Sequence, residues 1–320
     1  MSSSCDPDYK DAQFAFYRYE PSLGAAVVFT IIFVVTTILH TFQMIKTKTW
    51  YLIAFVLGGA CEILGFIGRA IGANEEAGCW TLPPYILQST FILIGPALMA
   101  ASIYMVLARI IVLTDGQQYA LIKRRFLTKI FVAGDVLALI LQAQGGGLMS
   151  MAGPDNNFME MGEIIIIVGL FIQLACFGTF VVVSAVFHRR MNRAPTPKAL
   201  QTEIRWRDYL RTLYVASGLI WVRSLFRVIE YLEGNDGYLI SHEVYIYVFD
   251  ALLIATTMLW MNWYHPGEIG LLLRGEEINA TNGLQLVGVG RKNGTKGRYR
   301  ESLTSVDSST ASRSALRTQV

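Results

Sequence analysis

Seven long apolar runs dominate this sequence and leave few folds open to it. Each run is at least 21 residues long, and a helix of about 20 apolar residues spans the hydrocarbon core of a bilayer. Charged residues make up only 16% of the chain, against roughly 25% in a soluble domain. We therefore predict an all-α, polytopic membrane protein, a seven-transmembrane helix bundle. Its spans are 22–45, 50–72, 83–108, 129–149, 161–187, 212–232 and 243–264.

The sixth run is the weakest of the seven because Arg223, Arg227 and Glu230 interrupt it. We include it because the apolar stretch LYVASGLIW leads into it. The distribution of positive charge also requires an odd number of spans, since the segments before the first run and after the last fall on opposite sides of the membrane.

Basic residues collect in alternate loops. Twenty-two of the 27 lysines and arginines follow the first, third, fifth and seventh runs, whereas the other loops are acidic. Lysine and arginine accumulate on the cytoplasmic side of membrane proteins, so the N-terminus is predicted outside and the C-terminus in the cytosol. The expected organisation is an extracellular segment 1–21, a transmembrane domain 22–264 and a cytosolic tail 265–320, largely disordered after about residue 280.

Two of the four cysteines fall on the predicted outer side. Cys5 lies in the N-terminal segment and Cys79 in the loop after the second run. Disulfides form in oxidising compartments, so a bridge between the two is one alternative. Two unpaired thiols are the other. Cys61 and Cys176 lie inside runs, where small packing residues are expected.

Charged and polar side chains recur at helical spacing within four of the runs. Such groups at bilayer depth are costly and are candidates for function, and residues three, four or seven apart share a helix face. The simplest packing turns the four faces inward, around a polar cavity or an ion-pair network. The candidates are Glu62, with Arg69 seven residues later; Asp135 and Gln142; Arg223, Arg227 and Glu230; and Glu243, Tyr247 and Asp250.

Ion pairs within one helix are the alternative for two of these sets. Arg69 is near the outer end of its run and can extend its head to the interface, which would make Glu62 and Arg69 a helix-end pair. Arg227 and Glu230 can likewise pair along one helix face.

The two aspartates have no basic neighbour on their own helices. Asp135 and Asp250 therefore need partners elsewhere in the bundle, and Arg223 or Arg227 is the expected donor. The glycines that follow Asp135 in the fourth run, Gly145, Gly146 and Gly147, are expected to make that span flexible.

Several chemistries lack a motif in this sequence. It has no phosphate-binding loop of the Walker type, no pair of histidines at metal-ligand spacing and no recognisable nucleophile–base set. We therefore predict no metal, no cofactor, no nucleic-acid partner, no catalytic residues and no enzymatic activity.

The stretch AGDVLALILQAQGGGLM at 133–149 resembles the signature of the RTA-like family of fungal membrane proteins, also called the lipid-translocating exporter family. The segments at 96–111 and 223–254 and the sequence His265-Pro266-Gly267 agree with the family in order and spacing. The resemblance covers roughly residues 20–270. It implies seven helices in a fungal plasma membrane or, alternatively, a vacuolar or other internal membrane. It also implies resistance to toxic amphiphiles through export or flipping of sphingoid long-chain bases or phospholipids.

The leading hypothesis is a lipid transporter, or a regulator of lipid transport, that hydrolyses no ATP. Membrane lipids are then its partners. Asp135, Glu230 and Asp250 would accept a cationic head group, while Arg223 and Arg227 would keep those carboxylates ionised or bind a phosphate.

A seven-helix receptor is the alternative hypothesis. It would sense lipids or stress and bind cytosolic partners through the loop 188–211 and the tail. A membrane enzyme acting on lipids is a third, less favoured alternative, and the oligomeric state stays open.

Overall fold

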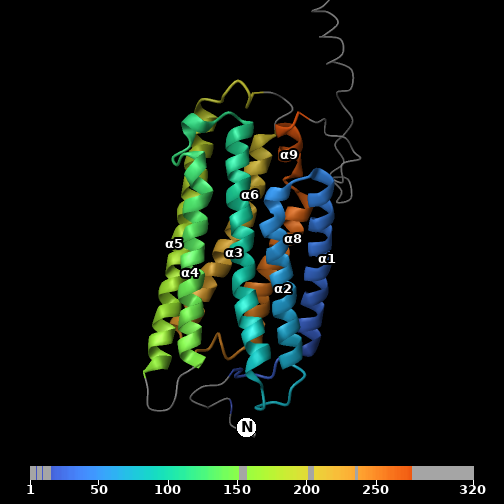
Figure 1. Ribbon diagram of the computed structural model, residues 1–320, viewed down its shortest axis with the longest axis vertical. Helices are drawn as coiled ribbons and strands as arrows, with labels where there is room; N and C mark the ends of the chain where they lie inside the picture. Colours follow the sequence, from blue (N-terminus) through green and yellow to red (C-terminus); the bar gives the residue numbers. More distant parts are fainter. Residues whose placement is uncertain are drawn as a thin grey trace, which may run out of the picture. The chain divides into compact units, whose positions relative to one another are not determined.

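The computed structural model describes Cys5, Tyr9 and residues 16–150, 157–200, 205–234 and 237–275. These residues form a bundle of long helices that run side by side (Figure 1). The expected disorder after residue 280 lies outside the described residues. The helices are α1 (Leu23–Thr47), α2 (Ile53–Gly72), α3 (Leu82–Leu113), α4 (Arg124–Ser150), α5 (Phe158–Arg193), α6 (Trp206–Leu232), α7 (Glu243–Ile246), α8 (Leu252–Trp263) and α9 (Gly267–Leu273).

Seven helical segments of the described chain are long and apolar enough to cross a membrane, which confirms the predicted fold class. The sixth, α6, has the lowest mean hydropathy, 1.3, because of its charged residues. The seventh joins α7 to α8 through a π-helical turn, η3 (Tyr247–Ala251). Helices α3 and α5 extend past their predicted ends at 108 and 187, since helical hydrogen bonding continues into flanks that hydropathy no longer marks.

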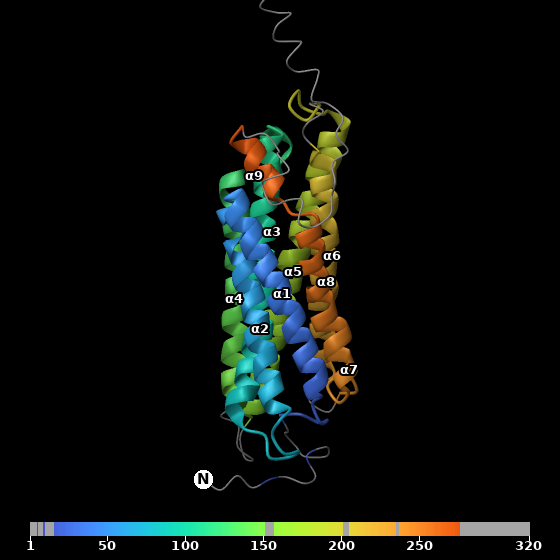
Figure 2. The same ribbon diagram turned by 90° about the vertical axis from the view of Figure 1, so that its right-hand side faces the viewer.

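Helix α3 is the centre of the bundle. It packs against α2, α4 and α6, and 61% of its most apolar window is buried, against 28% for α1 and α4. Helices α4 and α5 form one flank, and α1 lies between α2 and α8 on the other (Figure 2). Helix α9, within the segment predicted to be tail, packs against α1 and α3.

The N-terminal segment is tied to the end of the bundle at which α1 begins. A disulfide joins Cys5 to Cys79 in the α2–α3 loop. Tyr17 donates a hydrogen bond to Gln88 Oε1 of α3 at 2.8 Å, and its ring packs edge-on against Trp80. We refer to this end of the bundle as the N-terminal end.

The glycine run of α4 is helical throughout, and the flexibility that we expected of it stays a prediction. Helix α4 continues through it to Ser150. Gly145 lies at a close crossing with α5, where a Cβ atom would lie 2.5 Å from the Gly162 carbonyl oxygen. A Cβ atom on Gly146 or Gly147 would meet nothing within 4 Å. Gly145 therefore allows close helix packing, as small residues do in membrane bundles.

Replacement of these glycines separates packing from helix propensity. We expect Gly145→Ala to lower the free energy of unfolding by about 1–3 kcal/mol, because the added methyl group forces α4 and α5 apart. The matched Gly146→Ala should leave stability unchanged or raise it, because alanine favours a helix over glycine. Thermal unfolding of the purified protein in detergent measures both, and equal effects would contradict the packing role.

Candidate functional site

A buried ion pair joins α6 to the last span. Arg223 donates from Nε to Asp250 Oδ1 at 2.6 Å and from Nη2 to Asp250 Oδ2 at 3.1 Å. The two side chains are 2% and 1% exposed. A two-pronged arginine–carboxylate pair is among the strongest polar contacts in proteins. The structure thus supplies one of the two expected partners for Asp250.

Arg223 also completes the hydrogen bonding of α3. Pro96 has no backbone N–H, so the Ile92 carbonyl four residues earlier lacks its helical donor. Arg223 Nη2 donates to that carbonyl oxygen at 2.8 Å. One guanidinium group therefore connects three spans at a point where each unpaired polar group would be costly.

The π-helical turn η3 contains Asp250. Such turns carry one residue more than an α-helical turn and occur frequently at functional sites. Asp250 and Ala251 are the buried residues of η3. The spacing of Glu243, Tyr247 and Asp250 predicted one shared helix face but did not indicate the π-turn.

A second pair continues the polar face of α6. Arg227 Nη1 donates to Glu230 Oε2 at 2.6 Å, which is the pairing within one helix that the sequence offered as an alternative. Arg227 Nε also lies 4.0 Å from Asp250 Oδ2. The two ion pairs therefore form one continuous group.

Glu62 of α2 lies beside this group. It is 0% exposed, and its carboxylate lies against Gly95 of α3, one helical turn from the Ile92 carbonyl to which Arg223 donates. A Cβ atom on Gly95 of α3 would lie 2.6 Å from Glu62 Oε1, so any larger residue there would force the Glu62 carboxylate to move. Neither carboxylate oxygen has a hydrogen-bond partner among the described residues. We call Glu62, Arg223, Arg227, Glu230 and Asp250 the ion-pair cluster.

Arg69 lies in a separate group nearer the N-terminal end. It is fully buried and donates to Glu243 Oε1 at 2.8 Å and to the hydroxyl groups of Tyr247 and Tyr19 at 2.8 and 3.0 Å. The alternative in which Arg69 reaches the interface and pairs with Glu62 is therefore wrong. Tyr19 was not predicted, because the possible Cys5–Cys79 bridge ties the N-terminal segment to the loop after α2 without indicating which side chain would reach Arg69.

The polar residues of α4 lie outside the ion-pair cluster. Asp135 accepts a hydrogen bond from Tyr104 of α3 at 2.8 Å, and Gln142 donates to Gln173 of α5 at 3.0 Å. The expectation that an arginine of α6 would pair with Asp135 is wrong, and so is the single inward-facing arrangement of four spans. Tyr104 and Gln173 were missed because each is an isolated polar residue in an apolar run.

Comparison with known proteins shows the family to which this chain is similar. Residues 55–271 match the family described as RTA1 like protein. The chain belongs to the RTA1-like family. No solved structure matches it.

Three relatives of this RTA1-like protein come from Saccharomyces cerevisiae. Protein RTA1 is 35% identical over 264 residues, covering 75% of this chain and 81% of the relative. Protoporphyrin uptake protein 1 is 34% identical over 280 residues, covering 76% and 89%. The sphingoid long-chain base transporter RSB1 is 28% identical over 279 residues, covering 77% and 72%.

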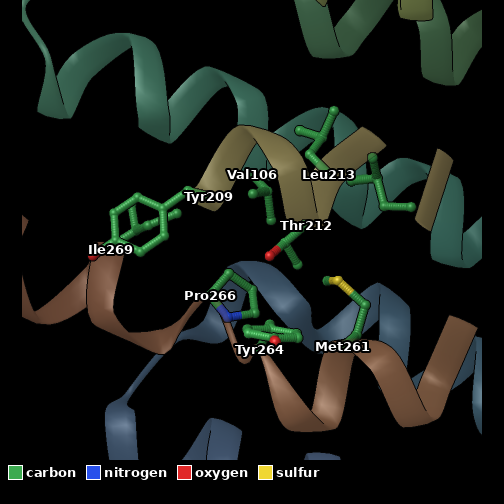
Figure 3. Close-up of a pocket in the computed structure, with 9 residues that line it drawn as sticks. Val106, Tyr209, Thr212, Leu213, Met261, Tyr264, Pro266 and Ile269 are labelled. Carbon is green, nitrogen blue, oxygen red and sulfur yellow. The ribbon is translucent and has the colours of Figure 1, made fainter. Parts of the chain in front are cut away.

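Three cavities of this RTA1-like protein lie away from the ion-pair cluster. A pocket of about 10 Å³ between α6 and the last span (Figure 3) is too small for more than a water molecule. A polar pocket of about 350 Å³ at the N-terminal end is lined by Tyr9, Arg18, Tyr19, Glu20 and Ser241. An apolar groove of about 430 Å³ lies between α1 and α2. The described residues contain no group of three or more His, Cys, Asp or Glu that could hold a metal ion.

Arg223 donates to the carbonyl that Pro96 leaves without a helical donor, so the effects of mutating Arg223 and Pro96 on stability should depend on each other. We expect Arg223→Lys to destabilise the protein, because a lysine cannot reach Asp250 and the Ile92 carbonyl with a planar fork. Pro96→Ala gives that carbonyl its own helical donor. The cost of Arg223→Lys should therefore fall by about 1 kcal/mol when residue 96 is alanine. A double-mutant cycle of thermal unfolding measures this coupling, and strictly additive costs would contradict it.

Proposed function

We propose that this RTA1-like protein moves amphipathic molecules with a positively charged head, sphingoid long-chain bases first among them, across the membrane. Two relatives support transport, since one is named as a sphingoid long-chain base transporter and another as a protoporphyrin uptake protein. The sequence has no phosphate-binding loop, so movement without ATP hydrolysis by this chain is part of the proposal.

The unpaired carboxylate of Glu62 carries the proposal. A buried charge without a partner is costly, and an intramembrane ionisable residue marks a substrate or ion path by default. The expected acceptors Asp250 and Glu230 are already occupied by Arg223 and Arg227. Glu62 is the member of the ion-pair cluster whose oxygens accept no hydrogen bond from the described residues, so it can receive an ammonium head group.

The arginines of the cluster fit an anionic head group less well. Arg223 directs its donors to Asp250 and to the Ile92 carbonyl, and Arg227 donates to Glu230. Arg227 Nε has no hydrogen-bond partner among the described residues, but a phosphate that bound it would lie against the carboxylates of Asp250 and Glu230. A cationic base therefore suits the cluster better than a phospholipid.

The surface of α2 offers a place for the tail of such a molecule. The apolar groove between α1 and α2 is lined by Val27 and Ile31 from one helix and Ile67 and Ile71 from the other, and these side chains are exposed on the bundle. Helix α2 also carries Glu62. A tail in the groove would remain in lipid, and the head group would have to pass from this exposed face of α2 to its buried face, where Glu62 lies beside α3.

The proposed orientation places the N-terminal end outside and α9 in the cytosol, with the plasma membrane as the site of action. The alternating basic loops support this orientation. The disulfide between Cys5 and Cys79 supports it independently, because such bonds persist in oxidising surroundings.

Liposomes that contain the purified protein and a fluorescent sphingoid base test the proposal. We expect the wild-type protein to speed movement of the base between leaflets, and Glu62→Gln to slow it about tenfold through loss of one charge-assisted contact. Glu62→Asp should keep part of the activity.

Glu268→Gln is the matched control, because Glu268 is a carboxylate of α9, away from the ion-pair cluster, and accepts a hydrogen bond from the Tyr209 hydroxyl. It should match the wild type. A wild-type protein that moves no base would favour the receptor alternative. Equal rates for Glu62→Gln and wild type would remove Glu62 from the path.

A further inference from the structure

The ion-pair cluster contains one positive charge too few. It holds three carboxylates, those of Glu62, Glu230 and Asp250, but two guanidinium groups, those of Arg223 and Arg227. Arg69 cannot supply the missing charge, because it is paired with Glu243. A net negative charge buried in a bilayer is strongly disfavoured. A further positive charge must therefore accompany the cluster.

Glu62 is the position at which that charge is missing. The other two carboxylates each have an arginine within 2.6 Å. Both oxygens of Glu62 lack a donor among the described residues, and the side chain is completely buried.

Among the described residues, the positive group that faces Glu62 is Arg223, which is already paired with Asp250. Arg223 comes from α6 and Asp250 from η3, and Cys61 is the titratable neighbour on its own helix. Helix α3 presents Gly95. On α1, the titratable His40 packs against Phe55, about two turns along α2 from Glu62.

We propose that Glu62 holds one exchangeable positive charge, which is a proton in the empty protein and the ammonium head of the substrate in the loaded one. The inference rests on the proposed function and names its coupling ion. Because a single carboxylate holds either charge but not both, the two compete for it. The protein then exchanges one cationic amphiphile for one proton.

The exchange balances in atoms and charge. The protonated carboxyl of Glu62 loses its O–H proton to water on the side from which the substrate arrives, and the resulting carboxylate pairs with the substrate ammonium. On the other side the ammonium leaves as a proton returns to Glu62. No net charge crosses the membrane, so the membrane potential neither drives nor opposes the cycle.

Two backbone features beside Glu62 provide for access to it. Pro96 removes one helical hydrogen bond from α3, next to Gly95. The π-helical turn η3 interrupts the regular helix of the last span around Asp250. The walls of the Glu62 site thus contain two features at which helices commonly kink.

A quaternary long-chain base tests the exchange. N,N,N-trimethylsphingosine carries a permanent charge, so it cannot cross as a neutral amine or bring a proton with it. In liposomes with an acidic interior, an internal pH dye and the membrane potential clamped, we expect wild-type protein to take up the probe while the interior loses one proton per probe. Glu62→Gln should lose proton movement, and Glu268→Gln should behave as wild type.

Binding in detergent provides a second measurement that does not require transport. The probe should release about one proton per molecule bound by the wild type and none from Glu62→Gln. The apparent Kd should rise about tenfold for each unit of pH below the titration of Glu62, because proton and probe compete for one site. Glu62→Asp should keep the competition, which covers the case in which Glu62→Gln does not fold.

The outcomes distinguish the exchange from the proposed function. Probe movement at a rate independent of the pH gradient, without proton release, would overturn the exchange and leave transport standing. Proton release by Glu62→Gln equal to that of the wild type would also overturn it. Failure of the wild type to move either the probe or a natural sphingoid base would overturn the proposed function itself.

Discussion

The contact of Arg223 with Asp250 and the Ile92 carbonyl is the interaction on which the centre of this bundle depends. The proline in α3 leaves a backbone carbonyl without its helical donor, the arginine in α6 carries a positive charge, and the π-helical turn in the last span holds an aspartate. A bilayer has no water to hydrogen-bond any of these groups. At this one point they satisfy one another. Each of the three features would be a defect in isolation, and together they fix the register of the three spans.

Helix α3 divides the polar interior into two parts. The ion-pair cluster lies among α2, α3, α6 and η3, whereas Asp135 and Gln142 face α3 and α5. Asp135 has a single tyrosine donor, and its Oδ1 atom has no partner among the described residues. The two parts differ in chemistry, since one is built from arginine–carboxylate pairs and the other from a carboxylate bound by a tyrosine hydroxyl and from a pair of amide groups.

The sequence was sufficient for the number of spans and for most of the charged residues that face the interior. Run length and helical spacing depend on local order along the chain, so Arg223, Arg227, Glu230 and Asp250 could be placed on inward faces. Partner choice depends on which helices are neighbours. The sequence therefore misplaced Asp135, which lies on a helix that packs against α5 and α3, and it missed Tyr104, Tyr19 and Gln173.

The glycines of α4 also show that the role of a residue depends on which helix lies beside it. Three consecutive glycines in a span indicate flexibility when only backbone freedom is considered. The neighbouring helix gives Gly145 a further role, because a Cβ atom there would meet Gly162, whereas one on Gly146 or Gly147 would meet nothing within 4 Å. Identical residues in sequence thus have different roles that only the α4–α5 contact distinguishes.

The bridge made by Arg223 also bears on how the chain enters the membrane during synthesis. Helix α3 is made first and carries a carbonyl group without a donor; α6, the least apolar span, arrives later with two arginines. Asp250, which neutralises the first arginine, arrives last. Span six therefore reaches its full stability in lipid only after the seventh has been made, and a ribosome paused between these two spans would leave a nascent chain that depends on the insertion machinery.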